Sequence, residues 1–180
     1  MKITLCGSMH HINGIVEAKK KLEALGYEIE TPDLSENSGY EGLSDEQRAA
    51  KKDRLIRQHM DKISDSDAIF VYNEEKKGVP GYVGGNSLME MAFAYAQGIE
   101  IFLLNDATEM NYTDEIYGMG PIVLSGKVDA IHAYFTGLPK TFVSSKSPIK
   151  LRAVSRGMRK AGIRTRVYPS PHLQTFRNSR

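Results

Sequence analysis

Short apolar runs of strand length alternate with longer segments of helical periodicity along residues 1–135, and this alternation limits the possible folds more than any other feature. It is typical of an α/β fold, in which helices cover both faces of a mainly parallel sheet. Residues 68–72 form the clearest run, because they are apolar throughout, as a strand buried on both faces requires. The expected strands are residues 3–6, 27–31, 68–72, 101–104 and 122–124, and the expected helices are residues 13–25, 44–64, 87–97 and 128–135.

A sharp change in charge divides the chain near residues 137–139. The net charge is +2, but residues 1–139 hold 13 Lys and Arg against all 22 Asp and Glu, whereas residues 140–180 hold 11 basic residues and no acidic one. We therefore expect one domain at residues 1–137 and a basic extension at residues 138–180. The extension has the pattern of a strand, a helix that begins at Pro148 and a second strand, with disorder expected from Pro169 onward.

The remaining composition argues against several classes of protein. No apolar run approaches the ~20 residues that a membrane helix needs, and the first residues lack the basic and apolar regions of a signal peptide, so we expect a cytoplasmic protein. Cys6 is the single cysteine, which rules out an internal disulfide and favours a buried thiol. His10 and His11 are adjacent, but Cys6, His59 and His132 show no ligand-like spacing with them, so we expect no metal site and no cofactor.

The loops that follow the strands are the first candidates for a binding site. In an open parallel sheet, ligands bind beyond the carboxyl ends of the strands, so the loops after Cys6, Tyr72 and Leu104 should line one crevice. Two consecutive glycines let the backbone approach a ligand, and the free N–H groups of the helix that follows suit a phosphate or a ribose oxygen. The candidate substrate-binding residues are Gly7, Ser8, His10, Asn73, Gly84, Gly85, Asn86, Ser87 and Asn105.

Two carboxylates are the candidate catalytic groups. Glu90 follows Ser87 by three residues, and this spacing fits a helix cap and a catalytic carboxylate equally well. Asp61 lies near the end of the helix that precedes the central strand, where it could face the same crevice. Two carboxylates in one pocket suit glycosidic chemistry, because one attacks or stabilises the cationic anomeric carbon while the other orients the sugar or assists the leaving base.

Three segments resemble the signature segments of the nucleoside 2-deoxyribosyltransferase superfamily. They are Leu5-Cys6-Gly7-Ser8, the run from Asp61 to Tyr72 and the run from Ser87 to Gly98. The resemblance covers residues 1–135 and implies a Rossmann-like, flavodoxin-like fold. The implied activity is hydrolysis or transfer at the N-glycosidic bond of a nucleoside or its 5′-monophosphate, and the implied assembly is a homodimer or higher homo-oligomer.

The resemblance also implies roles for single residues. Glu90 takes the place of the nucleophilic glutamate that forms a glycosyl-enzyme intermediate, and Asp61 that of an aspartate that positions the sugar and assists the base. Gly7 and Ser8 match the turn that surrounds the substrate, while Ser87 matches a position close to the 5′ end of the sugar.

Two alternative functions stay open. The turn at residues 84–87 together with Glu90 is similar to the glycine-glycine, threonine and glutamate motif of phosphoribohydrolases, which release a base from a nucleoside monophosphate, although it is one residue shorter. A non-catalytic nucleotide sensor would keep the crevice without the chemistry.

The basic extension carries a separate resemblance. Residues 145–154 are similar to the opening of the inosine/xanthosine triphosphatase family, but only about forty residues of that family's length are present, so we expect no triphosphatase activity. The extension either docks on the acidic body of its own or a neighbouring subunit, or it binds nucleic acid through phosphate contacts. The opposite charges of the two parts favour docking.

Overall fold

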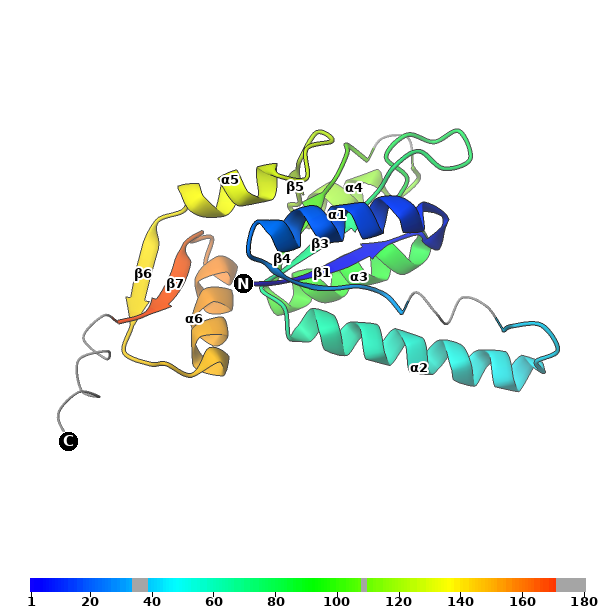
Figure 1. The fold of residues 1–180 in the computed structure, drawn as a ribbon, viewed down its shortest axis with the longest axis horizontal. Coiled ribbons are helices and arrows are strands. Elements are labelled where there is room, and N and C mark those ends of the chain that lie inside the picture. Colours follow the sequence, from blue (N-terminus) through cyan, green and yellow to red (C-terminus); the bar gives the residue numbers. More distant parts are fainter. Residues whose placement is uncertain (34–38, 108–109, 171–180) are drawn as a thin grey trace. The chain divides into compact units, whose positions relative to one another are not determined.

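The computed structural model describes residues 1–33, 39–107 and 110–170 (Figure 1). The chain packs as two compact units, one formed by Met1–Ala130 and one that begins at Ile131. This division falls shortly before residues 137 and 138, where the domain boundary stays a prediction. No helix in the described ranges is both long enough and apolar enough to cross a membrane.

A five-stranded parallel sheet forms the centre of the first unit. Its strands are β1 (Lys2–Gly7), β2 (Glu28–Glu30), β3 (Ala68–Tyr72), β4 (Glu100–Leu103) and β5 (Ile122–Val123). They lie in the order β2-β1-β3-β4-β5, which is the flavodoxin-like order and has its switch point between β1 and β3. The predicted α/β, Rossmann-like fold class is therefore confirmed.

Helices cover both faces of this sheet (Figure 1). They are the short 3-10 helix η1 (Met9–His11), α1 (Ile12–Ala24), α2 (Asp45–Ser64), α3 (Gly85–Gln97) and α4 (Thr113–Gly118). Successive strand residues point to opposite faces. Cys6 and Val71 share a hydrophobic cluster with Met91 of α3, whereas Tyr72 points to the other face and packs against Gly14 of α1.

The long helix α2 begins as its sequence predicts. Ser44 donates its backbone N–H to Gln47 Oε1 at 2.9 Å, and its hydroxyl oxygen accepts the backbone N–H of Gln47 at 3.3 Å. This reciprocal pair satisfies two N–H groups that the first turn would otherwise leave open. The last turns of α2 bury His59 and Ile63.

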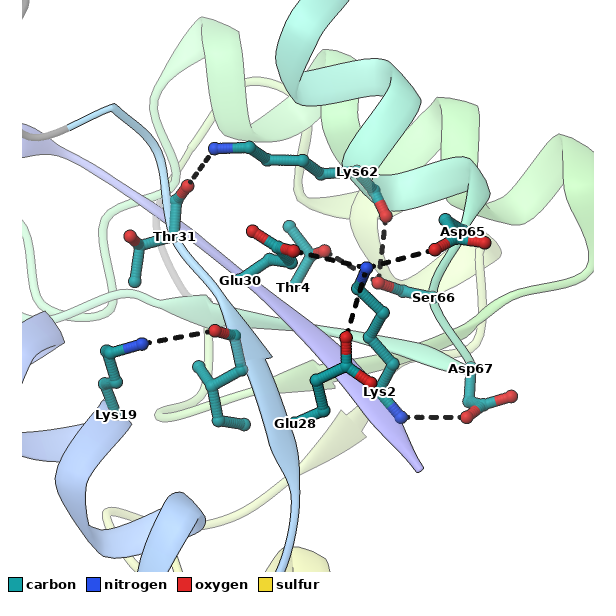
Figure 2. Close-up of polar contacts among 11 residues, drawn as sticks. Lys2, Thr4, Lys19, Glu28, Glu30, Thr31, Lys62, Asp65, Ser66 and Asp67 are labelled. Atoms are coloured by element: carbon teal, nitrogen blue, oxygen red, sulfur yellow. Dashed lines mark hydrogen bonds and ion pairs between the residues drawn. The ribbon is translucent and has the colours of Figure 1, made fainter.

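Polar contacts fasten the amino ends of the strands (Figure 2). The Lys2 ammonium group lies 3.0 Å from Asp65, 3.2 Å from Glu30 and 3.5 Å from Glu28. The Lys2 backbone N–H also donates to Asp67 Oδ2 at 2.9 Å. Burial lowers the pKa of Lys2, but hydrogen bonds to Asp65 and Glu30 outweigh it and leave the pKa raised. The contacts join β1 to β2 and to the turn between α2 and β3.

A second set of hydrogen bonds extends this fastening toward the middle of β1. The Thr4 and Ser66 hydroxyls lie 2.7 Å apart, and Ser66 Oγ donates to the Lys62 carbonyl oxygen at 2.9 Å. Figure 2 shows the Lys62 side chain reaching across to the Thr31 carbonyl oxygen, to which it donates at 2.8 Å. The end of α2 is thereby tied to β1 and to the segment after β2.

The second unit contains nearly all of α5 (Ala130–Gly137), followed by a parallel two-stranded sheet and a further helix. The sheet and the further helix consist of β6 (Lys140–Val143), α6 (Pro148–Lys160) and β7 (Arg166–Pro169), which confirms the predicted basic β-α-β extension and the helix start at Pro148. The Thr141 and Thr165 hydroxyls lie 2.8 Å apart, and the Phe142 and Tyr168 rings lie 6.0 Å apart.

The extension is ordered slightly further than its sequence predicts. Disorder was expected from Pro169, but Pro169 pairs with Val143 in the sheet, and the Ser170 backbone N–H donates to the Val143 carbonyl oxygen at 2.8 Å. The rest of that expectation falls on residues 171–180, outside the described part of the chain.

Candidate active site

A pocket with a volume of about 410 Å³ lies beside the carboxyl end of β1. Small-molecule sites usually have volumes of ~300–1,000 Å³, so it can hold a ligand of that class. Its walls come from β1 and the turn after it, from the segment after β2, from one face of α2 and from the first turns of α3. The lining residues used below are Gly7, Lys52, His59, Asp61, Asn86 and Glu90.

The loops after β3 and β4 do not line this pocket. Tyr72, Glu74 and Asn105 line a different one, with a volume of about 280 Å³, together with residues of α1. The expectation that the loops after Cys6, Tyr72 and Leu104 share one crevice is therefore wrong. The reason is the alternation of side chains along the strands, which turns Tyr72 toward α1 and Cys6 toward α2 and α3.

Glu90 lies in the second turn of α3 and does not cap it. The helix begins at Gly85, two residues before the expected start, and its N-cap is Gly84, whose carbonyl oxygen accepts the Leu88 N–H at 2.9 Å. A capping box joins the N-cap residue to the third helical residue, which here is Ser87. The cap interpretation of Glu90 is therefore wrong, and its carboxylate is available to the pocket.

The Glu90 carboxyl group is buried without enough partners to balance its charge. Oε1 lies 3.4 Å from His59 Nε2, and Oε2 has no hydrogen-bond partner among the described residues. Burial raises the pKa of Glu90 from 4.5 to about 7, although Cys6 and the positive charge of Lys52 act in the opposite direction. Near pH 7, both the acid and the carboxylate are populated; the carboxylate fraction can act as a base or a nucleophile.

His59 is neutral at physiological pH. Burial lowers its pKa from 6.5 to about 4, the positive charge of Lys62 adds to this effect and Glu30 opposes it. The 3.4 Å contact with Glu90 is thus a contact to a neutral imidazole and not an ion pair. His59 Nδ1 is buried and lacks a hydrogen-bond partner in the described ranges. Two unpartnered polar atoms in one contact pair cost stability, which is typical of functional sites.

The Cys6 thiol completes this group. Its Sγ atom lies 3.6 Å from His59 Nε2, and the side chain is fully buried, as the sequence predicts. Burial raises the pKa of Cys6, and the charge of Glu90 raises it further, so the thiol is protonated at pH 7. One ligand atom from each of Cys6, His59 and Glu90 lies within 4.8 Å of the others. The spacing of Cys6, His59 and Glu90 along the chain does not predict that their side chains meet.

Asp61 lines the same pocket as Glu90 and lies in the last turns of α2. Its side chain is exposed, whereas that of Glu90 is 14% exposed. The structure thus brings the two carboxylates singled out by the sequence into one pocket and gives them different environments.

Of the two residues predicted at the end of β1, Gly7 lines the pocket and Ser8 lies outside the lining. A Cβ atom at Gly7 would lie 2.9 Å from the Tyr72 carbonyl oxygen, so the close pairing of β1 with β3 requires glycine. Ser8 Oγ accepts hydrogen bonds from Lys76 Nζ at 2.7 Å and from the His10 backbone N–H at 3.3 Å. His10 is exposed and lies outside the pocket lining.

Four substrate-binding residues are predicted at the start of α3, and one of them lines the pocket. Asn86 lines the pocket, whereas Ser87 is buried in the first turn of the helix. Gly84 and Gly85 form the helix start itself. The exposed N–H groups of this turn stay candidates for a substrate oxygen.

Asn73 and Asn105 do not belong to the group around Glu90. Asn73 is fully buried, its Nδ2 donates to the carbonyl oxygens of Gly81 and Asn105 at 3.0 and 2.9 Å, and its Oδ1 accepts the Asn105 N–H at 3.0 Å. Asn105 Nδ2 donates in turn to the Asn73 carbonyl oxygen at 3.2 Å. These amides join the loops after β3 and β4, and their part in substrate binding stays a prediction.

His59 is the main site residue that the motifs missed. It lies four residues after Leu55 and four residues before Ile63, on the apolar stripe of the predicted helix. A histidine at that spacing is expected on the buried face. This periodicity could have identified it, but only the fold shows that it meets Glu90.

Comparisons with known proteins place the fold. No family model matches the chain, and no curated protein matches it. Among solved structures, it is similar to a 2-deoxyribosyltransferase from the psychrotolerant bacterium Bacillus psychrosaccharolyticus, with a TM-score of 0.56 and 17% sequence identity over 74% of this chain and 92% of that protein. The chain therefore has the α/β fold of a 2-deoxyribosyltransferase.

Proposed function

We propose that this protein cleaves the N-glycosidic bond of a nucleoside or its 5′-monophosphate and passes the glycosyl group to water or to a second base. The observation that carries this proposal is the buried, incompletely partnered carboxyl group of Glu90 in a pocket that Asp61 also lines. The fold shared with a 2-deoxyribosyltransferase supports the same chemistry.

In the first half-reaction, the Glu90 carboxylate attacks the anomeric carbon of the sugar. A carbon–oxygen bond forms while the bond between C1′ and the base nitrogen breaks, and the electron pair of that bond leaves with the base, which takes up a proton. Burial makes the carboxylate a better nucleophile, because few hydrogen bonds have to be broken before it attacks.

In the second half-reaction, water or another base attacks the same carbon and releases the Glu90 carboxylate. We assign Asp61 to the sugar, which it orients from α2, and to the departing base, which it assists by a hydrogen bond. Asn86 and the N–H groups at the start of α3 bind the 5′ side of the substrate. Lys52, which lowers the pKa of Glu90, favours the ionised nucleophile.

The test is incubation of the purified protein with a panel of ribo- and deoxynucleosides and their 5′-monophosphates, followed by chromatography of the free bases. Parallel reactions contain a second base, so that exchange separates a transferase from a hydrolase. We expect release or exchange with at least one member of the panel. No release and no exchange from any substrate would contradict the proposal.

Two variants connect the activity to the pocket. Glu90→Gln should bind the substrate and release no base, while Glu115→Gln, which changes an exposed carboxylate of α4, should leave the reaction unchanged. A protein that binds nucleotides equally well with and without Glu90 and that never releases a base would be a sensor. That outcome would replace the catalytic proposal.

A further inference from the structure

Of the three side chains that meet beside the pocket, Cys6, His59 and Glu90, the first two have no part in the proposed glycosidic reaction. Neither the Cys6 thiol nor the His59 imidazole attacks the sugar in the proposed reaction, yet both lie at its nucleophile. The thiol is fully buried and the imidazole is 8% exposed, so neither is an incidental surface group. Buried polar groups that lack partners call for a ligand or a function.

The distances within this group match the edges of a metal-binding tetrahedron. A zinc ion with a Zn–S distance of ~2.3 Å and Zn–N and Zn–O distances of ~2.0 Å separates sulfur from nitrogen by about 3.5 Å and nitrogen from oxygen by about 3.3 Å. The observed separations are 3.6 Å for Cys6 Sγ and His59 Nε2 and 3.4 Å for His59 Nε2 and Glu90 Oε1. The third edge, between Cys6 and Glu90, is no longer than 4.8 Å.

The donor set also agrees with zinc. A thiolate, an imidazole nitrogen and a carboxylate oxygen are the three ligand types that Zn²⁺ uses in proteins, whereas Mg²⁺ and Ca²⁺ prefer oxygen alone. The three residues come from β1, α2 and α3, which pack together in the core, so the ligand atoms are held on well-ordered elements. Glu90 Oε2, which lacks a partner in the described ranges, can turn to the ion as well.

The fourth coordination position would face the pocket. His59 and Glu90 both line the pocket, while Cys6 closes the group from the protein side. Three protein ligands with one open position are the arrangement of exchangeable and catalytic zinc sites, in contrast to closed structural ones. His59 Nδ1 has no acceptor among the described residues, so the orienting hydrogen bond of a permanent site is missing and binding should be reversible.

We propose that Cys6, His59 and Glu90 form a reversible binding site for a zinc-class divalent ion, with its open position toward the pocket. Binding itself is independent of the enzymatic activity. Its consequence rests on the proposed function: a Glu90 carboxylate that ligates the ion is not available to attack the sugar, so zinc should inhibit base release and a chelator should restore it.

The experiment is a calorimetric titration of the metal-free, untagged protein with Zn²⁺, with Co²⁺ as a spectroscopic probe of the same site. We expect one ion per chain and a thiolate-to-cobalt absorption band in the near ultraviolet. Cys6→Ser, His59→Gln and Glu90→Gln should each weaken Zn²⁺ binding by at least about tenfold. His10→Gln, which alters an exposed histidine outside the pocket lining, is the matched control and should bind as the parent does.

Each result decides between the possibilities. Circular dichroism and thermal melting verify that the variants are folded; if Cys6→Ser does not fold, the cobalt–thiolate band of the parent and the Glu90→Gln titration carry the test. Absence of the band, absence of Zn²⁺ binding, or weaker binding only in His10→Gln would overturn the proposal. Zinc binding without any base release would support the site and contradict the proposed enzymatic function, so the two proposals fail separately.

Discussion

At the amino end of β1, Lys2 and Thr4 contact the turn after α2, and at its carboxyl end Cys6 contacts His59 of the same helix. Because the three residues alternate along the strand, their side chains point to one face of the sheet. Lys2 has four carboxylates within contact of its ammonium group or backbone N–H, and Thr4 is paired with Ser66. Near Cys6, by contrast, His59 Nδ1 and Glu90 Oε2 lack partners among the described residues.

The paired polar groups near Lys2 stabilise the fold, whereas the incompletely paired ones near Cys6 are available to bind or react with a ligand. A buried polar atom without a partner costs about 1–3 kcal/mol, so the two atoms near Cys6 lower the stability of the fold. The satisfied contacts near Lys2 offset that cost and fix the register of β1 against β2 and β3. Substitutions at the amino end should therefore change stability, and substitutions at the carboxyl end should change activity.

The largest effect is expected for Glu90→Gln. Without its nucleophile, base release should fall by at least about a thousandfold, whereas the free energy of unfolding should stay the same or rise, because a buried carboxylate is removed. Chromatography of the released base and urea denaturation measure the two quantities. A large loss of stability would show that Glu90 stabilises the fold, as the contacts of Lys2 do.

Lys2→Met should have the next largest effect, this time on stability. The variant leaves Glu30 and Asp65 close together without a positive charge between them, and partial exposure of these carboxylates limits the expected loss to about 1–2 kcal/mol. Base release by the folded protein should be unchanged. Lys20→Met, which alters an exposed lysine of α1, is the control for the loss of one charge.

The activity of the metal-free protein should depend on pH with a midpoint near 7. Since Glu90 attacks in its ionised form and its pKa is about 7, the rate at saturating substrate should rise about tenfold from pH 6 to pH 8. The neutral His59, with a pKa of about 4, does not titrate in this range. A flat profile would indicate that another group limits the reaction.

Glu90 should also make the free energy of unfolding depend on pH, and this quantity should fall where the activity rises. The pKa of Glu90 is raised from 4.5 in the unfolded chain to about 7 in the folded protein, so the stabilisation is full below pH 4.5 and is lost as the pH rises through 7. Chemical denaturation at several pH values measures this loss, and the free energy of unfolding of Glu90→Gln should not show it.

The smallest effect is expected for Thr4→Val. The methyl group fills the space of the hydroxyl, and Ser66 keeps its hydrogen bond to the Lys62 carbonyl oxygen, so we expect a loss of about 1 kcal/mol and no change in activity. Chemical denaturation followed by circular dichroism measures it. A loss much larger than this would mean that Thr4 also positions Cys6.

Most of the helices and strands of this protein follow from local patterns in its sequence. Apolar runs and helical periodicity identified the strands of the parallel sheet, Ser44 and Gln47 identified the start of α2, and Pro148 identified the start of α6. These signals are local, because each depends on residues a few positions apart. The short helices η1 and α4 were not predicted, since one or two turns carry too little periodicity.

The contacts between residues far apart in the chain depend on how the helices and strands pack. The start of α3 at Gly85 excluded the cap at Glu90, and the alternation along β1 and β3 put Cys6 and Tyr72 on opposite faces of the sheet. Cys6, His59 and Glu90 lie on three elements far apart in the chain, and their contact depends on strand order and register. Those are set by the packing of the whole sheet and its helices, which no local pattern of residues encodes.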